Sequence, residues 1–340
     1  QSHFSVVRLN RDVAQRSKIG MIFTNRVDHG REQQQAYGAD ANLWLSNPMV
    51  FQSFFAQTQT SPGGATKTAW KLGLDFTKDH WGWFASHMAI DEGFDPGVGF
   101  VLRSDIRRSF ATFRVSPQPN GSFLRRTNIF QNFSHLTNLA GRLQDWDYRL
   151  TFMNELANGD NLIFGYGRLF ERLEQNFGFR SNLLIRSGDY NNNLLQASYQ
   201  SSAKHKLTVS SGVFWREFYD GELFAWGAGL GYRPNAHWSL RAGYDRNQVD
   251  LPQGELNTDL FALRVNYAYN TKLFLNTLVQ YNSETNELST NLRLNFIHSP
   301  GSDLFIVYNE SRGRESENFS DGLPSRNREV ILKFTRLFRL

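Results

Sequence analysis

The chain has 340 residues, a formal net charge of +5 at pH 7 and no cysteine, so a disulfide framework and a thiolate metal site are both excluded. Apolar residues never run for about 18 positions or more, which excludes a transmembrane helix. Lysine and arginine are scattered among acidic residues instead of forming one patch, so we expect no nucleic-acid partner.

The composition is compatible with a membrane-spanning β-barrel. Its mean hydropathy of -0.49 is low for a membrane protein, but a barrel strand needs apolar side chains only at alternate positions. Aromatic residues make up 14% of the chain, which is high for a soluble domain. Such a content suits the aromatic belts that barrels place at the two membrane interfaces.

Alternation of apolar and polar residues predicts strands throughout the first half of the chain. Successive strand residues point to opposite faces, so a period of two marks a strand. The clearest case places Trp70, Leu72 and Leu74 on one face, and Trp81 and Trp83 open the next strand. In chain order, the predicted strands cover residues 3–13, 19–26, 39–46, 50–60, 70–76, a strand that opens at 81, then 108–115, 124–136, 146–153 and 162–167.

The alternation is most regular in the second half of the chain. One face there is apolar and rich in Tyr, Phe and Trp, whereas the other carries Asn, Gln, Ser, Gly and paired charges. Residues 171–189 form the longest irregular stretch, and we expect a large external loop there. The predicted strands cover residues 195–200, 209–216, 224–232, 238–245, 261–269, 275–282, 292–296, 304–309 and 330–340.

These two faces indicate a membrane barrel rather than a soluble sandwich. A sandwich usually carries Lys, Glu and Thr on its outer face, while a transmembrane barrel turns apolar side chains to lipid and polar ones to a wet lumen. We therefore predict an all-β fold, with residues 1–340 forming one closed antiparallel transmembrane β-barrel of roughly 18–20 strands. Turns after alternate strands are short, as periplasmic turns are, and they fall at residues 47–48, 78–80, 235–236, 271–272 and 300–302.

The number of strands bears on how the barrel closes. The alternation marks about nineteen strands, whereas single-chain bacterial barrels have an even number. Either the true strand number differs by one from this count, or a further strand lies before residue 1; because the first turn is short and therefore periplasmic, the second alternative is favoured. Residues 1–12 lack the basic start and apolar core of a signal peptide, so we expect a mature chain or a fragment.

Charged residues on the polar faces are predicted to line the lumen. Both signs occur, so cross-strand ion pairs that hold a wet wall together are the favoured role. A selectivity surface is the functional alternative, because charged rings in a pore bias which solutes pass. The predicted lumen-lining residues are Lys71, Asp75, Asp147, Arg149, Arg241, Asp245, Arg264 and Arg293.

No motif in the sequence predicts an enzyme, a metal site or a cofactor. The histidines lack the spacing of converging metal ligands, and no G-x-S-x-G elbow occurs. His87, with Ser53 or Ser86 nearby in the sequence, is the set we consider for a hydrolase, although the orienting third group is not evident. The acidic loop 91–95 could offer oxygen ligands to Ca²⁺, but a solvated external loop is favoured.

Two strings resemble motifs of a known family. Residues 99–105, GFVLRSD, and residues 301–310, GSDLFIVYNE, resemble motifs of an outer-membrane β-barrel family of unknown function. Full-length members of that family carry an N-terminal domain similar to a carbohydrate-binding module, and the resemblance here covers the barrel part alone. Leu102 stands where the family pattern has proline. No catalytic residue is implied.

The resemblance and the barrel pattern together imply a location in the outer membrane. The expected partners are outer-membrane lipid and lipopolysaccharide, with other envelope proteins or carbohydrate as further candidates. The expected function is a channel or transporter-like protein, with carbohydrate-related solutes implied by the resemblance. The main alternative is a non-conducting barrel that serves as an anchor or as a subunit of an envelope or secretion assembly. A surface hydrolase is the minor alternative.

Overall fold

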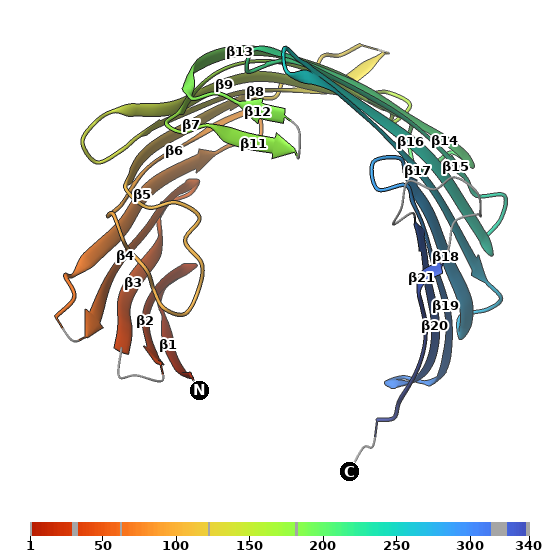
Figure 1. The fold of residues 1–340 in the computed structure, drawn as a ribbon, viewed down its shortest axis with the longest axis horizontal. Helices are drawn as coiled ribbons and strands as arrows, with labels where there is room; N and C mark the ends of the chain where they lie inside the picture. The colour runs from red at the N-terminus through yellow and green to blue at the C-terminus, as the bar shows by residue number, and fades with distance from the viewer. Residues whose placement is uncertain are drawn as a thin grey trace.

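The computed structural model describes residues 2–28, 33–61, 63–121, 123–180, 183–313 and 325–337. A 19-stranded antiparallel sheet contains all but two of its 21 strands, and each strand of the sheet pairs with the next along the chain. The other two, β11 and β12, form a separate hairpin between β10 and β13. Figure 1 shows the large sheet curved into an arc, with this hairpin on the concave side. Within the described ranges, no helix is long and apolar enough to cross a membrane.

The strands account for most of the described residues. The last strand begins earlier than predicted, at Ser325, and residues 338–340 of the predicted strand lie outside the described residues. The bounds are β1 His3–Ala14, β2 Ser17–Val27, β3 Gln33–Ser46, β4 Met49–Ser61, β5 Lys67–Thr77, β6 Trp81–Ile90, β7 Ile106–Val115, β8 Leu124–Thr137, β9 Leu143–Leu156, β10 Asn161–Leu173, β11 Phe177–Arg180, β12 Leu183–Ile185, β13 Gly188–Gln200, β14 Leu207–Phe218, β15 Gly221–Tyr232, β16 Trp238–Leu251, β17 Gly254–Ala268, β18 Leu273–Asn282, β19 Glu287–Ser299, β20 Ser302–Gly313 and β21 Ser325–Thr335.

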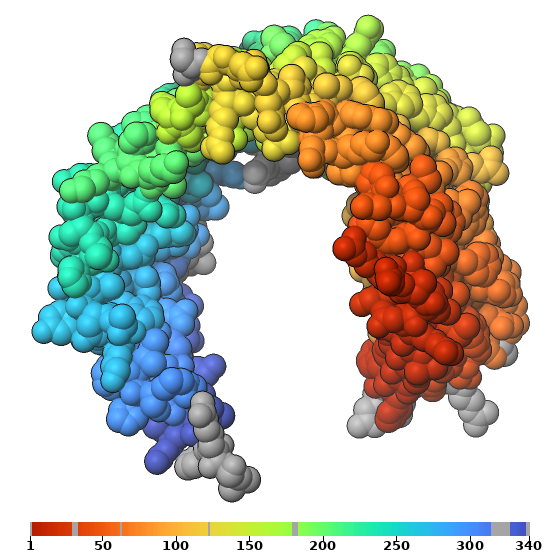
Figure 2. Space-filling view, turned by 180° about the vertical axis from the view of Figure 1, so that it is seen from behind, coloured from red at the N-terminus to blue at the C-terminus, as the bar shows by residue number. Residues whose placement is uncertain are grey.

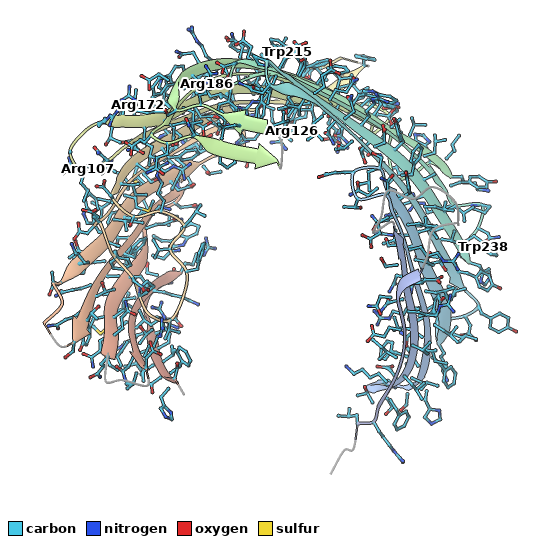
Figure 3. All side chains as sticks on the ribbon, viewed as in Figure 1. Arg107, Arg126, Arg172, Arg186, Trp215 and Trp238 are labelled. Atoms are coloured by element: carbon cyan, nitrogen blue, oxygen red, sulfur yellow. The ribbon has the colours of Figure 1, made fainter. Side chains whose placement is uncertain are left out.

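The register divides the side chains of the large sheet between a convex and a concave face. Directly paired residues share a face, so the pairing assigns each strand position in turn. In β15, Phe224, Trp226 and Leu230 are exposed on the convex face, while glycines at alternate positions lie on the concave face. Trp215 and Trp238 also lie on the convex side of the arc in Figure 3. The apolar faces that the alternation predicts are therefore the convex ones.

The apolar part of the convex face forms a band with aromatic residues at its two limits. On β16 it runs from Trp238 to Tyr244, a rise of about 20 Å along the strand, and it ends at Arg246. Aromatic pairs mark both limits: the ring centroids of Trp238 and Tyr267 lie 4.5 Å apart, and those of Trp226 and Tyr244 lie 5.0 Å apart.

The connections differ in length between the two ends of the strands. One end, the short-turn end, holds the turns at 15–16, 47–48, 78–80, 233–237, 269–272 and 300–301. The opposite end, the long-loop end, holds the segments 91–105 and 174–187. All the short turns predicted from the sequence lie at the short-turn end. Short connections nevertheless occur at the long-loop end, at 138–142, 219–220, 252–253 and 283–286, and the connection 116–123 at the short-turn end is longer than its neighbours. Residues 314–324 of a further connection lie outside the described residues.

The large sheet has two edge strands that are not paired with each other in the described structure. β1 pairs with β2 alone and β21 pairs with β20 alone, and Figure 2 shows the gap between these two edges. The two edge strands run in the same direction, because successive strands alternate in direction. The predicted class, an all-β antiparallel barrel fold, is confirmed, and the predicted closure does not take place between β1 and β21.

Residues 171–189 are not the irregular external loop that the sequence predicts. β10 extends to Leu173, and β13 begins at Gly188. The residues between them contain the β11–β12 hairpin, which lies over the concave face (Figure 1). The reason is apolar burial, because Leu183 and Ile185 pack against that face.

Asp160 joins two neighbouring turns at the short-turn end. Its carboxylate accepts hydrogen bonds from the backbone N–H of Ser202 at 2.7 Å and from the hydroxyl of Tyr199 at 2.8 Å. Asn158 donates to the same carboxylate, and Nε2 of His205 lies 3.8 Å away. These hydrogen bonds, led by the one from Ser202, hold the pKa of Asp160 below its ordinary value.

The lowered pKa of Asp160 predicts a loss of stability in acid. The folded state favours the carboxylate, so its contribution is present above the unfolded pKa of about 4 and is lost as the pH falls through the lower folded pKa. We expect Asp160→Asn to be less stable than the wild type at about pH 7 and to lose less stability between pH 4 and pH 3. Urea titrations measure both effects, and an identical pH dependence of the two proteins would contradict this role.

Leu292, near the middle of the convex face of β19, probes the assignment of faces. We expect Leu292→Arg to lower the free energy of unfolding by about 2 to 4 kcal/mol, because it places a guanidinium in hydrocarbon. Asn291→Arg, one position away on the concave face, is the matched control and should change that free energy by about 0.5 kcal/mol or less. Urea unfolding in lipid vesicles gives both values. Equal losses in the two variants would show that the faces are wrongly assigned.

Candidate functional site

The concave wall carries all eight charged residues that the sequence assigns to the lumen. The register places them there together with the polar side chains and glycines of neighbouring strands. They fall into two groups, one in the first half of the sheet and one in the second. The residues are Lys71 and Asp75 on β5, Asp147 and Arg149 on β9, Arg241 and Asp245 on β16, Arg264 on β17 and Arg293 on β19.

In the first half of the sheet, the concave charges have close partners. Asp147 and Arg149 project from the same side of β9, and the guanidinium contacts the two carboxylate oxygens at 2.9 to 3.0 Å. Nζ of Lys71 lies 5.7 Å from the ring centroid of Phe84, which is a cation–π contact. An exposed ion pair contributes about 1 kcal/mol or less, so these contacts mainly orient the side chains along the wall.

A concave ion pair that the sequence analysis missed links β1 to β3. Nη2 of Arg8 lies 2.5 Å from Oδ1 of Asp40, and the side chain crosses β2 at Gly20, where an added Cβ would collide with the guanidinium. The apolar–polar alternation of residues 3–13 is weak, so the sequence did not predict this pair. The position of Arg8 within that alternation was the signal that could have assigned its face. Asp75 lies on the same wall and accepts a hydrogen bond of 2.9 Å from Thr77.

In the second half of the sheet, concave cations lack carboxylate partners. Arg241 and Arg264 stand directly opposite each other in the register of β16 and β17. The guanidinium of Arg293 lies 4.6 Å from the ring centroid of Phe305. Among the described residues, none of these three arginines forms an ion pair with a carboxylate. Asp245 lies beside a glycine of β15, whose missing side chain leaves room for the carboxylate.

At the long-loop end, the β11–β12 hairpin packs onto an apolar part of the concave wall. Ile185 is only 1% exposed, and burying such a side chain contributes roughly 1.5 to 3 kcal/mol. The hydroxyl of Tyr190 donates a hydrogen bond of 2.8 Å to the backbone oxygen of Arg186. These contacts fix the hairpin over the wall. The buried cluster consists of Leu183, Ile185, Tyr190, Phe218, Val249 and Leu251.

Tyr219 stands at the edge of this cluster, in the turn between β14 and β15. Its ring meets those of Tyr190 and Phe218 edge-on, with centroid distances of 5.0 and 4.7 Å. Burial raises the pKa of Tyr219 to about 12, and the charge of Glu171 acts in the same direction. The phenol is therefore neutral at ordinary pH, and its hydroxyl donates to the Glu171 carboxylate at 3.4 Å.

The loop 91–105 covers the other side of the long-loop end. It reaches from β6 to β2 and β3, where Thr24 donates a hydrogen bond of 3.1 Å to the carbonyl of Pro96. Gln34 donates a bond of 3.0 Å to the carbonyl of Asp95. Thr24 and Gln34 both belong to the concave face. The hairpin and this loop therefore narrow the long-loop end from two sides.

The acidic loop 91–95 uses its carboxylates for hydrogen bonds to nearby groups. Oδ2 of Asp91 accepts hydrogen bonds from the N–H and the hydroxyl of Thr68 at 2.7 and 2.8 Å. Oδ1 of Asp95 accepts a bond of 2.9 Å from the N–H of Gly97. Across the described residues, no group of three or more His, Cys, Asp or Glu side chains is arranged to hold a metal ion.

His87 lies on the convex face, away from the concave wall. Its Nδ1 lies 2.8 Å from Oγ of Ser109, and its ring centroid lies 5.5 Å from that of Trp70. Ser86 points to the opposite face of the same strand, and Ser53 lies two strands away on β4. No hydrogen bond in the described part of the chain joins His87 to a carboxylate that could orient it as a base. The hydrolase arrangement considered from the sequence does not form.

Comparison with known proteins places this sheet among outer-membrane barrels. The chain matches no protein-family model and no curated protein. Among solved structures, it resembles the ferric enterobactin receptor PfeA from Pseudomonas aeruginosa with a TM-score of 0.58 at 10% identity, covering 99% of this chain and 70% of the receptor. The siderophore receptor PirA from the same organism gives 0.54 at 11% identity, covering 93% and 70%. The copper transporter OprC gives 0.51 at 10% identity, covering 99% and 72%.

At such low identity, these likenesses establish the fold alone. The fold is that of outer-membrane β-barrel receptors, so the fold class predicted from the alternation is confirmed, and with it the outer membrane as the setting in which this fold occurs. The matched proteins are receptors and a transporter by name, and these names do not point to an enzyme.

Proposed function

We propose that this chain is an outer-membrane transport barrel that passes polar solutes along its concave wall. The observation that carries this proposal is a polar concave wall combined with two inward-folded segments at its long-loop end. Barrels of about 16 to 22 strands enclose either an aqueous channel or a plugged lumen. The two segments favour a passage that is narrowed at one mouth.

Three observations bear on the choice of solute. The matched proteins are named for ferric enterobactin, siderophores and copper, which supports transport as a use of this fold. Carbohydrate-related solutes are supported by the sequence resemblance alone, through the family whose full-length members carry a carbohydrate-binding-module-like domain. The concave wall, with both charged and amide side chains, supports the wider class of polar solutes.

The hairpin also favours one alternative, a barrel that does not conduct. Ile185 is buried and the hairpin is held by an apolar cluster, so the narrowing could be permanent. Such a barrel would serve as an anchor or as a subunit of an envelope assembly.

Closure of the sheet is part of the same proposal. The edges of β1 and β21 offer unpaired backbone N–H and C=O groups, which are costly in lipid. Because the two edge strands run in the same direction, an all-antiparallel closure needs an odd number of additional strands between them. We propose that residues 1–340 belong to one barrel domain completed by such strands.

The buried side of the hairpin offers a direct test of transport. We expect Ile185→Asp to raise the single-channel conductance of the barrel, with the strands that complete it present, in planar bilayers, because an aspartate cannot stay in the apolar cluster and the hairpin leaves the wall. Leu184→Asp is the matched control, since Leu184 is 49% exposed on the other side of the same strand. Its conductance should equal that of the wild type. Ohmic steps that grow in Ile185→Asp alone support a gated transport path.

A lack of conductance in all three proteins would contradict the transport proposal. If wild type, Ile185→Asp and Leu184→Asp are all silent, although protease cleavage within 174–187 shows that the hairpin of Ile185→Asp has been released, the barrel does not conduct. The anchor alternative would then replace the transport proposal.

A further inference from the structure

We infer that the concave wall of β14–β18 contains a binding site for an oxyanion, formed by Arg241 and Arg264 with Arg233 at its rim. The ligand class is a solute that carries a phosphate or carboxylate group. This inference rests on the proposed transport function and names the class of solute that the path would take.

The first observation is a like-charge pair that forms no ion pair with a carboxylate within the described part of the chain. Arg241 and Arg264 are direct cross-strand partners, which places their Cβ atoms about 5 Å apart. Like charges in such positions destabilise a sheet. In the first half of the wall, by contrast, Arg8 is paired with Asp40 and Arg149 with Asp147.

The second observation is a cavity at this pair. It has a volume of about 440 Å³, and its lining includes Arg233, Arg241 and Arg264. None of the residues that line it is acidic, and all of them belong to the described part of the chain. Arg233 is tied down by donating a hydrogen bond to the backbone oxygen of Ala203 at the short-turn end.

The depth of the cavity comes from the glycines of β15. At Gly229 an added Cβ would collide with Oγ of Ser210, and at Gly231 it would collide with Oγ1 of Thr208. Both hydroxyls therefore lie over positions where any other residue would put a side chain. The space left by these glycines is therefore occupied by the two hydroxyls, and the floor of the cavity offers hydroxyl groups to a ligand.

The lining groups match the chemistry of an oxyanion. A guanidinium presents its N–H groups in a planar fork that binds carboxylate or phosphate oxygens in a bidentate way. The side chains of Ser210 and Gln280 add neutral donors to the same cavity. A bound anion would supply the negative charge that the pair of Arg241 and Arg264 lacks.

Inorganic pyrophosphate is a suitable probe because it offers several oxyanion oxygens. Equilibrium dialysis of the full chain in detergent should show saturable binding of pyrophosphate to the wild type. The double variant Arg241→Ser, Arg264→Ser should lose affinity by about tenfold or more. The matched control removes two concave cations from β5, Lys67→Ser with Lys71→Ser, and should change affinity by less than about twofold. Far-UV circular dichroism establishes that both variants are folded.

The outcomes separate this site from the transport proposal, because dialysis does not depend on conduction. Absence of saturable binding to the wild type, or equal losses in the arginine and lysine variants, would overturn the site and leave transport untouched. Binding that requires Arg241 and Arg264 in a chain that never conducts would support the site and reject transport.

Discussion

A chain that crosses a membrane has no water to satisfy its backbone there, so each N–H and C=O within the hydrocarbon must find a partner in the protein. Here 19 strands meet this demand in one antiparallel ladder. Pairing then forces successive side chains to opposite faces. Lipid selects apolar side chains for the convex face, and the concave face is left free for polar ones. The edges of β1 and β21 are the places where the described strands do not meet the demand.

The charge and polarity of the concave wall differ along the arc. In its first half charges are compensated, as in the pair of Arg8 with Asp40. Between β14 and β17 the wall has a glycine floor and carries Arg241 and Arg264 without a carboxylate partner. At the long-loop end the wall becomes apolar and holds the β11–β12 hairpin. One face of one sheet thus provides a narrowed mouth and, farther along, a cationic surface that a polar solute would meet.

Much of the sheet could be predicted because alternation is a local property of each strand. In β15, Trp226 and Leu230 fall on the convex face and the glycines that alternate with them fall on the concave face, as the sequence indicates. The hairpin could not be predicted, since Leu183 and Ile185 look like any short apolar run until β14 and β16 supply their partners. The face of the predicted charges was evident from the alternation, but their neighbours on other strands depend on the register, as where Arg241 of β16 stands opposite Arg264 of β17.

Site-directed labelling along β17 tests the assignment of faces most directly, because the chain has no cysteine of its own. Single cysteines would be placed at three convex positions and at the three concave positions that alternate with them, and a water-soluble maleimide would be added to the protein in lipid vesicles. We expect the concave cysteines to react faster by about tenfold, since water reaches that face and lipid covers the other. Equal rates at both sets would contradict a lipid-facing convex surface and a wet concave wall. The positions are Phe261, Leu263 and Val265 against Ala262, Arg264 and Asn266.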